Sequence, residues 1–183
     1  MTEIIIVIGI LILVIIWIFN LLVKDRNQVL AAWSDIDVQL KRRYELIPQL
    51  VNTVKAYADF EKATMTAVTE LRTRSKLETH LPEKSDLEMQ MGSAIGKLII
   101  IAEDYPELKA DGNFRQLQKE LTDIEDHVQY SRRFYNGAVR IFNTRVESFP
   151  HFIIARLFNF KIAEYFEVDH ADERKASVIK IND

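Results

Sequence analysis

The chain has 183 residues, a formal net charge of −3 and no cysteine. This length suits about one domain with a short attachment. The absence of cysteine excludes disulfides, thiol catalysis and thiolate metal sites, and the interspersed charges argue against nucleic acid, which selects a basic stripe. Because only five Gly and four Pro are available for turns, the sequence predicts an all-α fold.

The first segment, Ile4 to Val23, is apolar and uncharged and includes Gly9 and Trp17. As a helix, about 20 residues rise about 30 Å, which is the thickness of a bilayer's hydrocarbon core. We therefore expect a transmembrane helix. A cleaved signal peptide is the alternative, but Glu3 precedes the apolar run, the run is too long and no small-x-small cleavage site follows it.

Basic residues follow this apolar segment, and only one acid precedes it. Lys24 and Arg26 come directly after it, and Lys41–Arg43 follow on the same side. The positive-inside rule therefore predicts that the N-terminus lies outside and the bulk of the chain lies in the cytoplasm. We expect three parts: the transmembrane helix (1–23), a helical bundle (24–166) and an acidic C-terminal tail (167–183).

A long amphipathic helix is predicted directly after the span. No Gly or Pro separates the two, and apolar residues recur at three- and four-residue steps from Ala31 to Glu61 and on to about Lys76. Pro48 interrupts this pattern, and because its ring displaces the carbonyl of Tyr44, we expect a kink there. A simple bend is favoured over a functional hinge.

Two charged residues, Arg43 and Glu61, lie on the apolar stripe of this helix. A buried charge needs a partner, because its desolvation otherwise costs several kcal/mol. We therefore expect partners for both on neighbouring helices.

Two more helices are predicted further along the chain. Ser85 and Glu88 form a capping-box pattern, which predicts a helix from Asp86 to Asp104. Asn113 suits the N-cap of a third helix, whose apolar stripe runs to Phe149. Two long helices and one shorter helix leave broad apolar stripes without neighbours. We therefore expect a homo-oligomer that associates through these helices.

The segment from Phe149 to Phe166 is rich in aromatic residues. We expect a short helix after Pro150, with Asn159 as its C-terminal cap. Three interpretations stay open for this segment: it covers the end of the bundle, binds a partner or lies at a bilayer surface. Arg156 and Lys161 would suit anionic headgroups, but cover for the core is the more frequent case.

Short motifs along nearly the whole chain fall in a specific order and spacing. They are Asn20–Val23, Ala32–Ser34, Gln39–Arg43, Leu46–Pro48, Glu61, Arg72, Tyr105–Pro106, Leu108, Phe114, Leu117, Leu121, Glu125, Arg132, Tyr135–Asn136, Asn143 and Phe149–Pro150. Together they resemble the LemA family of bacterial membrane-anchored helical proteins. The chain departs from the family at Asn159, where Gly is commoner, and at Phe19, where Tyr is commoner.

The resemblance implies a helical bundle on a single N-terminal span, located in the bacterial inner membrane. No enzymatic activity is established for the family, so the resemblance implies location and fold more than chemistry. Asn159 tolerates the left-handed backbone that Gly adopts, so we expect the turn to be kept.

Polar residues on or beside the helical stripes form a candidate structural network. They are Arg42, Arg43, Glu61, Arg72, Glu125, Arg132, Asn136 and Asn143. We interpret them as interhelical partners that fix register, since buried polar pairs often add specificity more than stability. The alternative is a site for an anion or a lipid headgroup.

No catalytic residue, cofactor site or metal site is predicted. The chain has no Gly-rich phosphate loop, and neither G-x-S-x-G nor H-E-x-x-H occurs. Glu167 and His170 have the Glu-x-x-His spacing of di-iron bundles, but such sites need the motif twice, together with further inward glutamates.

Two functions fit this sequence. One is a non-enzymatic scaffold of the inner membrane that self-assembles and organises membrane or envelope. The other is an adaptor for a separate sensor, protease or envelope-stress machine. The mass of the protein in mild detergent discriminates between them, because only the scaffold forms a large homogeneous assembly of one chain.

Overall fold

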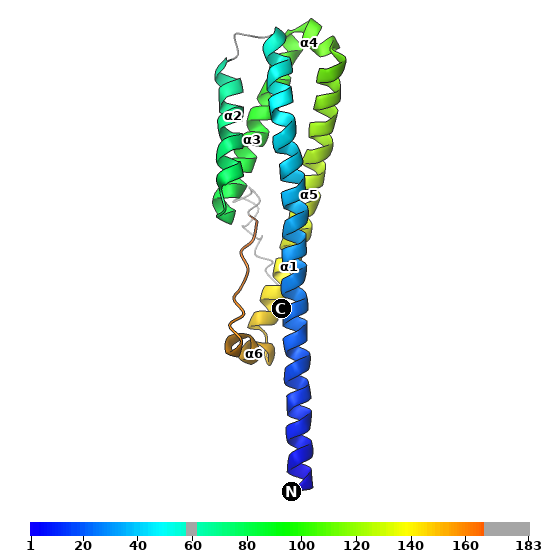
Figure 1. Ribbon diagram of the computed structural model, residues 1–183, viewed down its shortest axis with the longest axis vertical. Coiled ribbons are helices and arrows are strands. Elements are labelled where there is room, and N and C mark those ends of the chain that lie inside the picture. The colour runs from blue at the N-terminus through cyan, green and yellow to red at the C-terminus, as the bar shows by residue number, and fades with distance from the viewer. Residues whose placement is uncertain (58–61, 167–183) are drawn as a thin grey trace, which may run out of the picture.

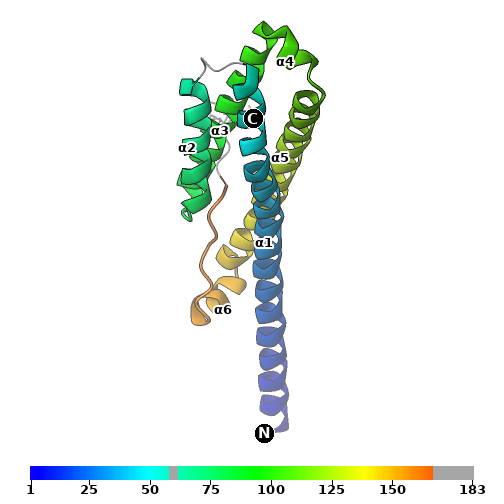
Figure 2. The ribbon, with the colours of Figure 1, turned by 45° about the horizontal axis from the view of Figure 1, so that its top comes forward.

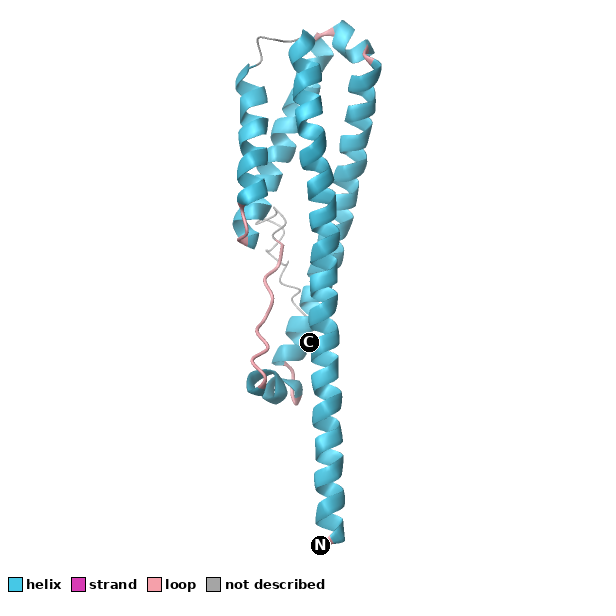
Figure 3. Ribbon diagram, viewed as in Figure 1, coloured by secondary structure: helices cyan, strands magenta, loops and turns pink. Residues whose placement is uncertain are grey.

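The computed structural model describes residues 1–57 and 62–166, and every regular element in these two ranges is helical (Figure 3). The longest element, α1 (Thr2–Tyr57), has 56 residues and rises about 84 Å as one helix. Its first part projects from the bundle, and its later part runs through the bundle (Figure 1). The prediction of an all-α fold, with a long apolar N-terminal helix that continues into a bundle, is confirmed.

The buried side of α1 is a line of positions at three- and four-residue spacing. These positions are Ile18, Leu22, Asp25, Val29, Ala32, Ile36, Leu40, Arg43, Ile47, Leu50 and Val54. Residues 4–14, by contrast, are exposed on all sides although they are apolar. An apolar surface all round is typical of a helix in lipid. Within the described part of the chain, α1 is the one helix long and apolar enough to cross a membrane.

Further helices pack beside the later part of α1, which keeps one exposed side (Figure 1, Figure 2). The chain continues through α2 (Lys62–Leu77), α3 (Leu81–Ile101), the 3-10 helix η1 (Ala102–Asp104), α4 (Pro106–Ala110) and α5 (Gly112–Glu147). α2 runs back beside α1, α3 returns beside α2, and α4 lies at the end far from the N-terminus. α5 then runs antiparallel to α1, so Arg43 faces Glu125 while Asp25 faces Arg145.

The prediction that the first long helix continues to about Lys76 is wrong. α2 is a separate helix that begins at Lys62 and runs in the opposite direction to α1. Met65 and Val68 of α2 are buried in the core, whereas a straight continuation would carry them beyond its neighbours. The homo-oligomer is predicted because three helices leave apolar surface without a neighbour. α2 is a further helix that covers part of this surface, so this reason for a homo-oligomer is weaker.

The predicted start of α3 is also wrong. α3 begins at Leu81 with Pro82 in its first turn, where the missing amide hydrogen of proline has no cost. Ser85 and Glu88 are therefore buried within the helix and do not cap it. The capping-box pattern considers only neighbouring residues, whereas in the folded chain Ser85 and Glu88 are buried inside the bundle.

The third long helix, α5, is capped by Asp111 and not by the predicted Asn113. The Asp111 carboxylate accepts a hydrogen bond from the Phe114 amide at 2.9 Å. This bond satisfies one of the free amide groups of the first turn.

A short helix, α6 (His151–Leu157), follows α5 and ends in the turn that the sequence predicts. Asn159 has a φ of 56°. The Phe160 amide donates to the Ala155 carbonyl at 2.9 Å, which closes the turn as in a Schellman motif. The predicted left-handed turn at Asn159 is confirmed, although the C-cap residue itself is Phe158 and Asn159 follows it. Residues 160–166 then run without helix, and the predicted acidic tail lies outside the described residues.

Substitution of Asn159 tests this turn. We expect Asn159→Gly to leave the free energy of unfolding unchanged or slightly higher. Asn159→Val should lower it by about 1–2 kcal/mol, because a β-branched residue is strained in the left-handed region. Circular dichroism melting of the full chain in mild detergent measures both. Gln116→Val, on the exposed side of α5, is the matched control, and equal melting of the two Val variants would contradict the assignment.

Candidate functional site

The buried charge of α1 lies in a layer shared with α3 and α5. Arg43 is 4% exposed, and its guanidinium lies 3.5 Å from Glu88 Oε2 of α3 and 3.0 Å from Glu125 Oε2 of α5. Glu88 is 1% exposed. The two buried charges neutralise one another, and charge-assisted hydrogen bonds offset their lost hydration.

Glu88 also accepts hydrogen bonds from two hydroxyl groups. The Tyr44 hydroxyl donates to Glu88 Oε1 at 2.5 Å, and the Ser75 hydroxyl of α2 donates to the same oxygen. Burial, and after it the negative charge of Glu88, raises the pKa of the Tyr44 hydroxyl above its ordinary value. Tyr44 therefore stays protonated and donates, and the network joins α1, α2, α3 and α5.

Pro48 provides a second contact between α1 and α2. α1 continues through Pro48 as one helix. Because proline has no amide hydrogen, the carbonyl of Tyr44 four residues earlier receives no helical hydrogen bond. Arg72 of α2 donates to this carbonyl from Nε at 2.6 Å. The proline that was predicted as a bend thus also exposes a backbone acceptor, which fixes the position of α2.

A cavity of about 470 Å³ lies between α3 and α5 next to this network. Gly92 of α3 borders it, and a Cβ atom at Gly92 would lie 2.9 Å from Arg43 Nη2. A side chain at position 92 would therefore force the guanidinium of Arg43 to shift within its ion pairs. The charged residues of the lining are Arg43, Glu88, Glu125, Asp126 and Arg132. The acids outnumber the arginines, a balance that does not favour the alternative of an anion site.

Arg132 of α5 is held mainly by an aromatic ring. Its guanidinium carbon lies 4.6 Å from the centre of the Phe166 ring, a cation–π distance. Its Nε and Nη2 are buried and make no hydrogen bond to the part of the chain that the structure describes. Burial lowers the pKa of Arg132, and the charges of Glu125 and Glu88 oppose that shift.

Asn136 and Asn143 of α5 hold the backbone of the extended segment 160–166. Asn143 donates to the Ala163 carbonyl at 2.9 Å and accepts from the Ala163 amide at 2.8 Å. Asn136 makes the same pair of bonds with Phe166, both at 2.9 Å. Each asparagine side chain thus bonds both the N–H and the C=O of one extended residue, as a neighbouring β-strand would. Because Asn136 binds Phe166 and Asn143 binds Ala163, the segment runs antiparallel to α5.

The spacing of the two asparagines matches the spacing of their partners. Seven residues of helix rise about 10.5 Å, and three residues of extended chain advance about 10 Å. Asn136 and Asn143 therefore fix the register of a non-helical segment against a helix. The prediction placed them between helices, but their hydrogen bonds go to this extended backbone. Tyr135 adds a third bond, from its hydroxyl to the Glu164 carbonyl at 2.9 Å.

The remaining residues of the predicted network lie elsewhere. Arg42 is exposed and donates to Gln39 of the same helix at 3.4 Å. Glu61 lies outside the described residues. The structure thus brings Arg43 and Glu125 together, with Arg132 beside them, and places Arg72, Asn136 and Asn143 on backbone groups of other segments.

Sequence reasoning missed two buried acids, Glu88 and Asp25. Asp25 is 5% exposed and lies 2.7 Å from Arg145 of α5. Both acids occupy stripe positions, since Asp25 falls three residues after Leu22 and Glu88 three residues before Met91. The same rule that singled out Arg43 would have found them.

The polar residues described above form hydrogen bonds and ion pairs with other residues of the same chain. In the ranges 1–57 and 62–166, no three His, Asp or Glu side chains are grouped as metal ligands. Glu167 and His170, the metal candidates from spacing, lie outside those ranges. The titratable groups of the network are paired with one another, an arrangement that fixes helix positions.

Replacement of Arg43 tests this arrangement. We expect Arg43→Leu to lower the free energy of unfolding by about 3–5 kcal/mol, because it leaves Glu88 buried without its cation. Lys41→Leu, an exposed residue on the same helix, should change it by less than about 0.5 kcal/mol. Urea unfolding in mild detergent measures both. Equal effects would show that Arg43 is not buried with an acid in solution.

Comparison with known proteins places this fold in a family. Residues 32–181 match the model of the LemA family. Protein LemA of Metamycoplasma hominis is 28% identical over 157 residues, which cover 84% of this chain and 72% of that protein. Magnetosome protein MamQ 2 of Paramagnetospirillum magneticum is 24% identical over 175 residues, and the match covers 81% of this chain and 64% of MamQ 2.

A shorter match comes from magnetosome protein MamQ of Magnetospirillum gryphiswaldense, at 29% identity over 75 residues and 41% of this chain. The chain thus spans less than two thirds of these MamQ proteins. The family match includes every residue of the Arg43 network and both asparagines that hold the extended segment. The chain belongs to the LemA family.

Proposed function

We propose that the protein is a non-enzymatic, membrane-anchored scaffold that assembles with copies of itself through its helical bundle. The observation that carries this proposal is an exposed aromatic and aliphatic stripe on α5. Tyr130, Phe134 and Ile141 are 64%, 46% and 47% exposed and follow each other at steps of four and seven residues. Gly137 lies between them, and nothing lies within 4 Å of the Cβ position it lacks. A stripe with this spacing fits a neighbouring helix.

The continuity of α1 supports a structural role. One helix runs from the candidate membrane span into the bundle, so a subunit cannot swing freely relative to its anchor. Confinement to a membrane with aligned axes lowers the entropic cost of association. That relatives of this chain are by name magnetosome proteins supports a membrane-associated role.

The second candidate is an adaptor, in which the same stripe binds a different membrane protein. The spacing of the exposed residues suits either a second copy of this chain or a different protein. Self-association is preferred because the membrane anchor aligns the axes of identical subunits, so that the stripes of two copies lie at the same height. A monomer that co-purifies with another chain would favour the adaptor.

Orientation is the first test of the anchor. We propose a single-pass protein of the bacterial inner membrane with its N-terminus outside, since Lys24 and Arg26 follow the apolar segment. A tag placed after Asp183 should resist protease added to the periplasmic side of intact cells. Digestion of the tag in intact cells would reverse the orientation, and lysed cells serve as the control.

Self-association is tested on the full chain in mild detergent. We expect light scattering to give a mass of several subunits, and Phe134→Glu with Ile141→Glu to reduce it to one subunit, because charges on the stripe are costly to bury. Gln116→Glu adds charge at an exposed position of the same helix and should leave the mass unchanged. A monomeric parent protein would refute the scaffold.

A further inference from the structure

Helix α6 carries apolar side chains on almost every side. Ile154 and Ala155 face the bundle and are buried. On the opposite side, Phe152, Ile153 and Leu157 are 41%, 49% and 72% exposed. Large apolar side chains gathered on an exposed helix face normally mark a surface that meets another apolar medium, and the bundle covers only the other side of α6.

The turn that follows α6 lies next to the candidate membrane span of α1. Phe19, near the end of the apolar run of α1, has its ring centre 4.8 Å from that of Phe158 and 5.8 Å from that of Phe160. Ile18 and Leu22, on either side of Phe19, are 2% and 0% exposed. The turn that ends α6 therefore packs against the last turns of the candidate span.

The length of the exposed apolar part of α1 also indicates the depth at which α6 lies relative to the bilayer. Residues 4–17 are almost all exposed and rise about 21 Å as a helix, whereas the hydrocarbon core is about 30 Å thick. The remaining thickness corresponds to residues 18–23, where the bundle already covers α1. If α1 crosses the bilayer, α6 thus lies at the depth of the headgroup and acyl boundary.

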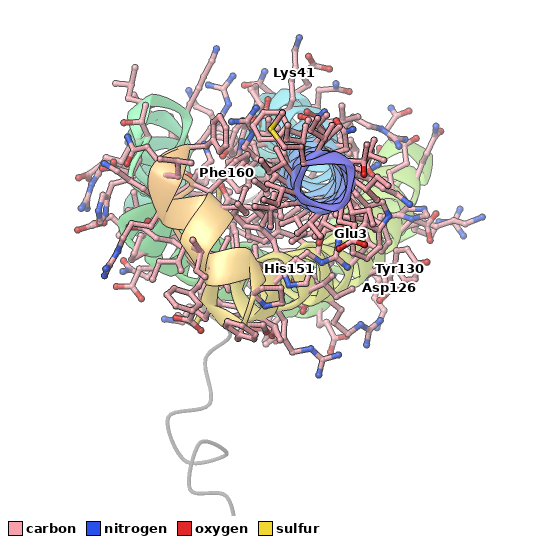
Figure 4. All side chains as sticks on the ribbon, turned by 90° about the horizontal axis from the view of Figure 1, so that it is seen from below. Glu3, Lys41, Asp126, Tyr130, His151 and Phe160 are labelled. Carbon is pink, nitrogen blue, oxygen red and sulfur yellow. The ribbon has the colours of Figure 1, made fainter. Side chains whose placement is uncertain are left out.

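The direction and charge of α6 suit that boundary. Seen along α1, α6 lies across the end of the bundle, whereas α1 is viewed end-on (Figure 4). A helix that lies across the end of the bundle in this view runs along the membrane surface and not through it. From Phe149 to Ala163 the chain has Arg156 and Lys161, both exposed, and neither Asp nor Glu. Basic side chains beside an apolar surface favour anionic headgroups.

We propose that α6 is an interfacial foot: it lies in the lipid boundary of the leaflet next to the bundle, with Phe152, Ile153 and Leu157 in contact with acyl chains. The foot fixes the height of the bundle above the bilayer and braces α1 where it leaves the membrane. The proposal rests on the membrane anchor proposed above. It is independent of self-association, because the stripe of Tyr130, Phe134 and Ile141 lies on another helix.

Single labels test the foot directly, because the chain has no cysteine of its own. Leu157→Cys carries an environment-sensitive fluorophore on the foot, Leu11→Cys carries it in the span, and Lys119→Cys carries it on the exposed face of α5. The full chain is reconstituted in vesicles of phosphatidylcholine and phosphatidylglycerol, with or without brominated phosphatidylcholine as a quencher. Bromine near the headgroup end and bromine deep in the acyl chain report two depths.

We expect the label at position 157 to be blue-shifted and to lose most fluorescence with the shallow quencher. The label at position 11 should respond most to the deep quencher, and the label at position 119 to neither. Loss of quenching at 157 with quenching kept at 11 would overturn the foot and leave the anchor. A blue-shifted but unquenched label at 157 would show protein on this surface and also overturn it. Absence of quenching at 11 would overturn the anchor itself.

Discussion

The ion pair between Arg43 and Glu88 is the constraint around which the bundle is arranged. Both charges are almost completely buried, so neither is tolerated unless α1 and α3 meet at this height. Glu125 brings α5 to the same layer, and the Ser75 hydroxyl brings α2. Apolar stripes alone would permit helices to slide by a turn, whereas a buried ion pair permits one register.

α1 connects three regions with different surroundings. Its first residues are apolar on every side, its middle turns contact the turn after α6, and its last half is the shared helix of the bundle. Because these regions share one continuous helix, the candidate span, the contact with the turn after α6 and the bundle are aligned along one axis. The pair of Asp25 and Arg145 keeps α1 and α5 together just beyond the apolar run.

The extended segment 160–166 completes the bundle without being a helix. Asn136 and Asn143 satisfy its backbone, and Phe166 fills the space beside Trp33 and beneath Arg132. A helix in this place would satisfy its own backbone and leave both asparagine amides without these partners. The segment thus explains polar residues on a face of α5 that is otherwise apolar.

Sequence by itself determined what depends on periodicity and local backbone preference: the apolar run at the N-terminus, the stripe of α1, the all-α class, and the left-handed turn at Asn159. It also singled out Arg43, because a charge on an apolar stripe is visible without coordinates. Tertiary structure alone decided where α1 ends, that Glu88 is a buried acceptor and not a cap, and that Asn136 and Asn143 bind extended backbone. The physical reason is that a side chain's periodicity shows which way it faces, whereas its partner comes from a distant segment whose position the local pattern does not encode.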